Sequence, residues 1–134
     1  MSLKRILLVE DEPRDIRLAA STAESIGISE VDARSSIQAA RNYLDNGLRG
    51  EGPLPDGIVL DLNLGYESGY ELLRYWHSEP RLSKIPVIVW SVLGDEQRHM
   101  CSLFHVSRYV AKWDGPKAIQ EALESLNDSV SSQT

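Results

Sequence analysis

The alternation of strand-like and helix-like segments constrains the fold of this chain more than any other feature. Short apolar runs alternate with segments whose apolar residues have helical spacing, and Gly, Pro, Ser or Asp separates one segment from the next. The predicted strands cover residues 6–9, 30–34, 58–62, 86–90 and 109–111, and a predicted helix follows each of them. This pattern predicts an α/β fold, a doubly wound five-stranded parallel sheet flanked by five helices.

Capping residues mark where two of these helices are expected to begin. Asp11-Glu12-Pro13 combines an acidic N-cap with a proline suited to the first helical turn. Taken alone, Asp11 is best interpreted as a cap. Ser68 and Glu71 have the spacing of a capping box.

Length and composition indicate one ordinary globular domain. The 134 residues are 42% hydrophobic and 25% charged, and no apolar run approaches a membrane span or the core of a signal peptide. We expect a domain at residues 1–126 and a disordered Ser-rich tail at 127–134. The net charge of −6 argues against a nucleic-acid surface, and the single Cys101 excludes an internal disulfide framework and favours a cytoplasmic location.

Polar side chains stand at the ends of four predicted strands. They are Glu10-Asp11, Asp61, Ser91 and Lys112. Because the carboxyl ends of parallel strands form one crevice, these groups are expected to meet there. Clustered carboxylates repel one another unless a hard cation such as Mg²⁺ lies between them.

Such a cluster has the parts that phosphoryl transfer requires. Asp61 would attack phosphorus, and Mg²⁺ held by Glu10, Asp11 and Asp61 would spread the charge on the phosphoryl oxygens. The Ser91 hydroxyl and the Lys112 ammonium would take the other oxygens. Singly, each group has a plainer role, Ser91 as a helix cap and Lys112 as a solvated surface residue.

With these residues in place, the chain resembles the response-regulator receiver domains of two-component signalling. The resemblance covers residues 4 to about 126 and rests on the stretches 6–13, 56–64, 85–91 and 109–112. It implies a flavodoxin-like fold, as in chemotaxis regulators, with strand order 2-1-3-4-5.

The resemblance also implies roles for individual residues. Asp61 would be the phosphoacceptor, Asp11 a direct Mg²⁺ ligand, and Glu10 a ligand through water. The backbone carbonyl of Asn63 would complete the metal shell. Ser91 would be the switch hydroxyl, Lys112 the phosphate-binding lysine, and Tyr109 the aromatic whose rotamer reports activation.

The chain departs from the family pattern close to the site. Trp113 replaces a proline that normally follows a cis bond, so the loop carrying Lys112 is expected either to be trans and differently aimed or to be strained. Val92 is bulkier than the usual Ala or Gly and is expected to narrow the approach to Asp61. Gly65-Tyr66-Glu67 replaces the common Pro-Gly turn. Trp113 is either a contact residue or packed over the last helix, and we predict that Val92 and Trp113 modulate access.

The function that these features favour is a signalling switch. The domain would accept a phosphoryl group on Asp61 from a histidine kinase or phosphotransfer protein with Mg²⁺. It would then signal to an output partner, or form a homodimer, through the face of the fourth helix, fifth strand and fifth helix. It would contact neither nucleic acid nor membrane. It would not be an enzyme, although it would carry its own phosphotransfer and autodephosphorylation chemistry.

Two other functions stay open on the sequence. One is a pseudo-receiver, a binding module that never takes phosphate, which Val92 and Trp113 keep in consideration. The other is a Mg²⁺-dependent phosphatase of the haloacid dehalogenase type. That class usually places its nucleophile on the first strand with a second Asp two residues later, whereas here the third strand carries Asp61 and Asn63 follows.

Overall fold

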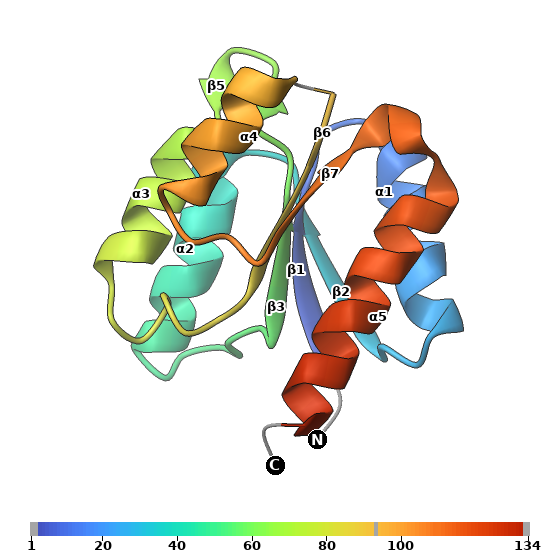
Figure 1. Ribbon diagram of the computed structural model, residues 1–134. Helices are drawn as coiled ribbons and strands as arrows, with labels where there is room; N and C mark the ends of the chain where they lie inside the picture. The colour runs from blue at the N-terminus through green and yellow to red at the C-terminus, as the bar shows by residue number, and fades with distance from the viewer. Residues whose placement is uncertain (1–2, 93, 133–134) are drawn as a thin grey trace.

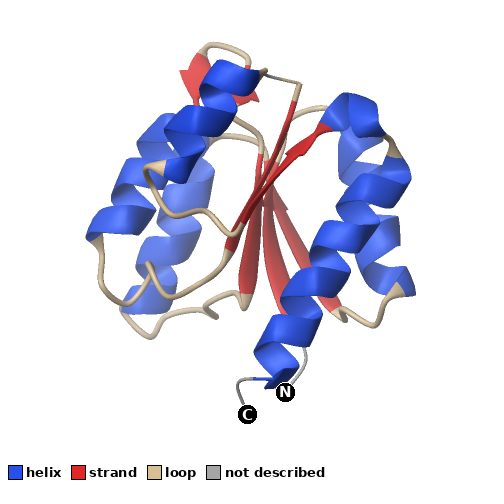
Figure 2. Ribbon diagram, viewed as in Figure 1, coloured by secondary structure: helices blue, strands red, loops and turns tan. Residues whose placement is uncertain are grey.

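The computed structural model describes residues 3–92 and 94–132, which form a five-stranded parallel sheet between two layers of helices (Figures 1 and 2). The strands of this sheet are β1 (Arg5–Val9), β2 (Glu30–Arg34), β3 (Gly57–Leu60), β6 (Val87–Ser91) and β7 (Arg108–Ala111). Their order is β2-β1-β3-β6-β7, and every pair is parallel. Counted along the chain this is the order 2-1-3-4-5, so the predicted flavodoxin-like fold is confirmed.

Five helices cover the sheet. They are α1 (Pro13–Ser25), α2 (Ile37–Leu48), α3 (Tyr70–Ser78), α4 (Asp95–Ser102) and α5 (Pro116–Ser132). Helices α1 and α5 cover one face, and α2, α3 and α4 cover the other (Figure 1). Within the described residues, none of these helices has the length and apolar character needed to cross a membrane.

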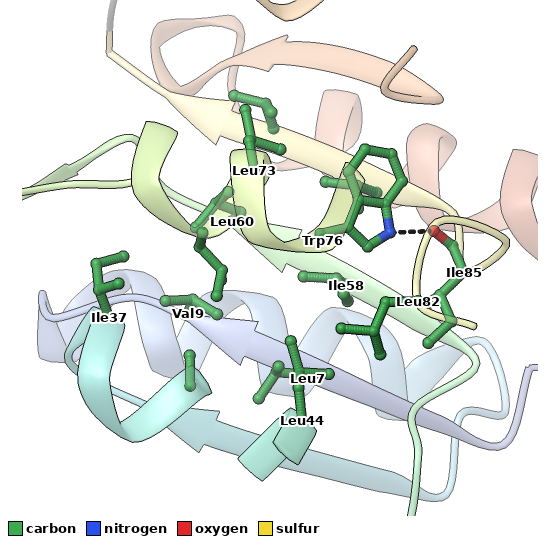
Figure 3. Close-up of a cluster of buried hydrophobic side chains, with 14 of the residues drawn as sticks. Leu7, Val9, Ile37, Leu44, Ile58, Leu60, Leu73, Trp76, Leu82 and Ile85 are labelled. Atoms are coloured by element: carbon green, nitrogen blue, oxygen red, sulfur yellow. Dashed lines mark hydrogen bonds between the residues drawn. The ribbon is translucent and has the colours of Figure 1, made fainter. Parts of the chain in front are cut away.

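The central strands are apolar on both faces because each face meets helices. In β1, Leu7 points into the core under α2 and α3, while Leu8 belongs to the core under α1 and α5. Figure 3 shows the first of these cores, where the Trp76 indole N–H donates to the Ile85 carbonyl oxygen at 3.0 Å. That bond satisfies the polar end of a side chain that is only 3% exposed. It also links α3 to the segment that leads into β6.

Two helix starts differ from the predicted caps. Helix α1 is capped by Glu12, whose carboxylate accepts from the Arg14 N–H, so the interpretation of Asp11 as the cap is wrong. The predicted capping box is also wrong, since α3 begins after Gly69 with no side-chain cap bond. Ser68 is instead part of a small hairpin, β4 (Asn63–Leu64) and β5 (Glu67–Ser68), which periodicity over so few residues could not indicate.

Helix α5 extends beyond residue 126, the predicted end of the domain. The Leu3 N–H donates to the Asn127 side-chain oxygen at 2.7 Å, which ties the first residue of the expected tail to the start of the chain. The helix continues to Ser132, and residues 133–134 lie outside the described residues. The division into a domain and a disordered tail therefore stays a prediction.

Candidate functional site

The register of the sheet brings the four predicted strand ends together. Val9 lies opposite Leu60 in the β1–β3 pair, so Glu10 and Asp61 leave the sheet side by side. Ser91 ends β6 opposite Ala111 of β7, and Lys112 follows directly. All of these residues lie at the carboxyl edge of the sheet, where α4 and α5 also begin (top of Figure 1).

Asp61 lies at the centre of the cluster and is only 5% exposed. One carboxylate oxygen, Oδ1, accepts from the Ser91 hydroxyl at 2.9 Å and from the Asn63 backbone N–H at 3.0 Å. The other, Oδ2, accepts from the Lys112 ammonium at 2.9 Å. The carboxylate is therefore held in one orientation by donors from three different segments.

Glu10 is fully buried beside it. Its Oε1 accepts from the backbone N–H groups of Asp11 and Glu12, both at 3.1 Å, and its Oε2 accepts from Lys112 at 2.6 Å. Burial raises the pKa of Glu10 to about 7; the Lys112 hydrogen bond opposes the shift and the Asp61 charge adds to it. The ionised form of Glu10 is therefore disfavoured by burial unless a further positive charge lies close to it.

Lys112 supplies the positive charge of the site. Its ammonium donates to Glu10, to Asp15 at 2.7 Å and to Asp61, and it lies 5.1 Å from the centre of the Trp90 ring. Burial lowers the pKa of Lys112, but the hydrogen bonds to the three carboxylates raise it by more, so the pKa lies above its ordinary value. The lysine is consequently a fixed cation at this edge.

Glu10, Asp11 and Asp61 form a group that can hold a metal ion. Each offers a carboxylate oxygen, and these oxygens lie within 4.8 Å of one another. Asp11 is exposed, which leaves one side of the group open to solvent. An all-oxygen set with an open side fits a hard divalent cation that keeps part of its water shell. The Asn63 carbonyl, predicted as a further ligand, stays a prediction.

The two expectations for the lysine loop are resolved by its backbone. The Lys112–Trp113 peptide bond is trans, like every other bond of the described residues. Residues Lys112–Asp114 form a 3-10 turn, and Gly115 reverses the chain at φ 89° before α5 begins. The trans loop still brings the ammonium to Asp61, so the replacement of proline by Trp113 has not removed the lysine from the site.

Large apolar side chains on the surrounding loops are exposed. Val92 is 52% exposed and Trp113 63% exposed, and Tyr66 is fully exposed at the tip of the β4–β5 hairpin. We call these three side chains the apolar rim. Trp76 and Trp90 are buried, whereas most of the Trp113 side chain is in contact with solvent, and its role as a contact residue stays a prediction.

Tyr109, the predicted switch aromatic, is half-buried on β7. The Arg98 guanidinium of α4 lies 4.8 Å from the centre of its ring. A cation over an aromatic face is attractive, so α4 and Tyr109 are linked directly. The role of Tyr109 as a switch stays a prediction.

Two residues of the site escaped the sequence analysis. Asp15 contacts Lys112 from the first turn of α1, and its only signal was an acidic residue four positions after Asp11. Gly69 packs against the Asp61 peptide, where a Cβ atom would lie 2.6 Å from the Asp61 carbonyl oxygen. Its signal in the sequence is a glycine directly after Ser68, a position that does not by itself indicate contact with Asp61.

Comparison with known families identifies the family of the chain. The response regulator receiver domain matches residues 6–124, nearly the whole chain. The chain belongs to this family. Receiver domains belong to two-component signalling, so the recognition made from the sequence is confirmed, and the phosphatase alternative is set aside.

Individual relatives agree with this assignment. The receiver domain is 33% identical to the response regulator Rcp1 of Synechocystis sp. over 112 residues, 81% of this chain and 76% of the relative. It is 27% identical to the phosphate regulon transcriptional regulatory protein PhoB of Escherichia coli, covering 96% of this chain and 53% of PhoB. The chain therefore spans about half the length of that second relative.

Solved structures give the same result. The Mn²⁺-bound form of Rcp1 superposes with a TM-score of 0.76 and 31% identity, covering 92% of this chain and 91% of the other. The phosphorylated cyanobacterial phytochrome response regulator RcpA superposes with a TM-score of 0.77 and 34% identity, covering 93% and 91%.

Proposed function

We propose that this receiver domain is a phosphorylation-switched signalling module that accepts a phosphoryl group on Asp61. One observation carries the proposal. The Asp61 carboxylate faces a hydroxyl donor, Ser91, and an ammonium donor, Lys112, within a group of oxygens suited to a cation. These are the components that stabilise a phosphoryl group during transfer.

Mg²⁺ is the cation we assign to Glu10, Asp11 and Asp61, with the Asn63 carbonyl as a further ligand. When bound, it would neutralise charge on the phosphoryl oxygens and on the crowded carboxylates. The donor set of carboxylate oxygens favours such a hard ion over one that prefers sulfur or nitrogen. The Mn²⁺ reported for Rcp1 is a similar hard ion in a relative.

The transfer step uses one oxygen of Asp61 as nucleophile. That oxygen forms a new bond to phosphorus while the bond from phosphorus to the donor nitrogen breaks, and the nitrogen keeps the bonding electron pair. The donor would be a phosphohistidine of a histidine kinase or phosphotransfer protein. Lys112 and Ser91 already donate to Asp61, so each can pass its hydrogen bond to a phosphoryl oxygen with little movement. In this scheme the domain is a phosphoacceptor and does not turn over a substrate. We place it in the cytoplasm, where its phosphodonor would lie.

The switch follows from the same bonds. Once Ser91 donates to the phosphoryl group, its hydroxyl is drawn inward, and Tyr109 can turn towards the space beside it. Arg98 links Tyr109 to α4, so a change in the ring reaches this helix. A difference of a few kcal/mol between the two arrangements is enough for such a switch.

We assign output to the face formed by α4, β7 and α5. A groove of about 500 Å³ lies there, lined by residues that include Arg98, Tyr109 and Glu121. Met100 and Leu103 are exposed beside it, at 41% and 58%. An output protein or a second copy of the chain would bind this face, with no direct role for nucleic acid or membrane.

Labelling with acetyl phosphate tests the acceptor. Wild-type protein should gain the mass of one phosphoryl group in the presence of Mg²⁺ and none after chelation, and Asp61→Asn should stay unlabelled while keeping its fold. Asp56→Asn is the matched control, since Asp56 lies at the opposite end of β3 and should be labelled normally. Labelling of Asp61→Asn at the wild-type rate would show that Asp61 is not the acceptor. Beryllofluoride that fails to bind wild type with Mg²⁺ would favour the pseudo-receiver.

A further inference from the structure

Asp15 is the acidic side chain of the site that the receiver chemistry described above does not use. It lies in the first turn of α1, its side chain is 24% exposed, and its Oδ2 accepts from the Lys112 ammonium at 2.7 Å. An acid in a first helical turn is favourable at the helix N-terminus wherever it points. The contact with Lys112 is therefore the feature that needs a separate explanation.

Lys112 uses its donors fully. An ammonium has three N–H groups, and three carboxylates from three segments accept from it. Glu10 follows β1, Asp61 follows β3, and Asp15 comes from α1. Transfer changes only the Asp61 partner, so the bonds to Glu10 and Asp15 can hold the lysine in place while a phosphoryl oxygen replaces the Asp61 oxygen.

Asp15 also changes the charge of the resting site. Its Oδ2 and the Asp61 Oδ2 bond the same nitrogen, so they lie within about 6 Å of each other. Glu10, Asp11 and Asp61 make up the metal group. With Asp15 the site has four carboxylates and one ammonium, and three of the carboxylates bond that ammonium.

We propose that Asp15 is a positioning residue that acts through Lys112: it offsets the lysine charge, which tightens the site for a divalent cation and slows anionic phosphodonors. The inference rests on the proposed function, because it assigns regulation to the same site. A negative charge attracts a cation and repels an anion, so its removal must weaken Mg²⁺ binding and at the same time speed labelling by an anionic phosphodonor. A purely structural role of Asp15 would not weaken Mg²⁺ binding and speed labelling at the same time.

The test is Asp15→Asn in the full chain. The amide keeps an oxygen that can accept from Lys112, removes the charge and replaces the second oxygen by an NH₂ group of similar size. Calorimetric titration with Mg²⁺ alone should give a dissociation constant about two- to five-fold higher than wild type, the size expected for a partly screened charge. Acetyl phosphate labelling, at Mg²⁺ saturating for each protein, should be faster by a similar factor.

Two further variants separate charge from helix stability. Glu24→Gln makes the same change in net charge on the same helix, at an exposed position in its last turn, and should leave both constants at wild-type values. Asp15→Glu keeps the charge and should restore both towards wild type. Three results would overturn the inference: an unchanged Mg²⁺ affinity and labelling rate in Asp15→Asn, a change of affinity and rate in the same direction (both higher or both lower), or Asp15→Glu behaving like Asp15→Asn. Wild-type protein that is never labelled would instead refute the proposed function, so the two failures are distinct.

Discussion

The interior of the carboxyl edge and its apolar rim reverse the usual distribution of side chains. Inside, Glu10 and Asp61 are 0% and 5% exposed. Around them, Val92 and Trp113 are 52% and 63% exposed on neighbouring loops. Burying a charge is costly unless it is paired, and single exposed apolar groups are common, but several gathered around one site are not the arrangement that stability alone favours.

The difference separates two kinds of role. The buried charges are held by specific hydrogen bonds, so changing one leaves its partners unpaired and affects stability and chemistry together. The rim makes contact with solvent, so changing it should alter approach and binding with little effect on folding. The following predictions test this separation, beginning with the largest expected effect.

Lys112→Ala should destabilise the fold most. It would leave Glu10 and Asp61 buried without their cation, which costs about 3 kcal/mol in the free energy of unfolding without Mg²⁺. Urea denaturation at pH 7 measures this, and added Mg²⁺ should recover much of the loss. Lys117→Ala is the control, because its exposed pair with Glu121 should contribute almost nothing. Equal stability of Lys112→Ala and wild type without metal would mean that the interior charges do not need the lysine.

Glu10 should make stability depend on pH in the absence of Mg²⁺. Burial raises its pKa from 4.5 to about 7, so between these values the folded chain binds more protons than the unfolded chain. The stabilisation is complete below the unfolded pKa and is lost as pH rises through about 7, a decrease on the order of 3 kcal/mol.

Denaturation at a series of pH values checks this, with Glu10→Gln as the comparison. The difference between wild type and the amide variant should change between pH 5 and pH 7 in the sense just given. If the two proteins show the same pH dependence over this range, Glu10 is not the group responsible.

Val92→Ala tests the part of the apolar rim next to Asp61. Removing this exposed bulk should speed labelling by acetyl phosphate a few-fold while changing the free energy of unfolding by less than about 0.5 kcal/mol. Leu103→Ala removes a similarly exposed side chain of the output face and should leave the rate unaltered. An equal or slower rate in Val92→Ala would mean that this residue does not control access.

Trp113 should have the smallest effect on the domain itself. Trp113→Ala and Trp113→Pro should leave acetyl phosphate labelling possible and stability nearly unchanged. Binding to the cognate phosphotransfer partner should weaken by about tenfold, as expected for an aromatic contact residue. Leu54→Ala, exposed on the loop before β3, is the control. Unaltered partner affinity in both Trp113 variants would mean that Trp113 is not a contact residue for this partner.

The sequence determined the fold and which polar side chains meet at the carboxyl edge of the sheet. Apolar runs that alternate with helical segments permit few arrangements, and parallel strands bring their carboxyl ends to one edge, so Glu10, Asp61 and Lys112 could be placed together before any coordinates. The short hairpin β4–β5 could not be foreseen in this way, because two-residue strands have no periodicity to detect.

Only the tertiary structure decided how these groups are held. The bond between Asp15 and Lys112 joins residues 97 positions apart, and neither residue carries a local signal of the other. Position 69 requires glycine because the Asp61 peptide packs against it. The N-cap of α1 is Glu12 and not Asp11. Such choices depend on distances between segments that are remote in sequence, and spacing along the chain contains no information about those distances until the sheet has formed.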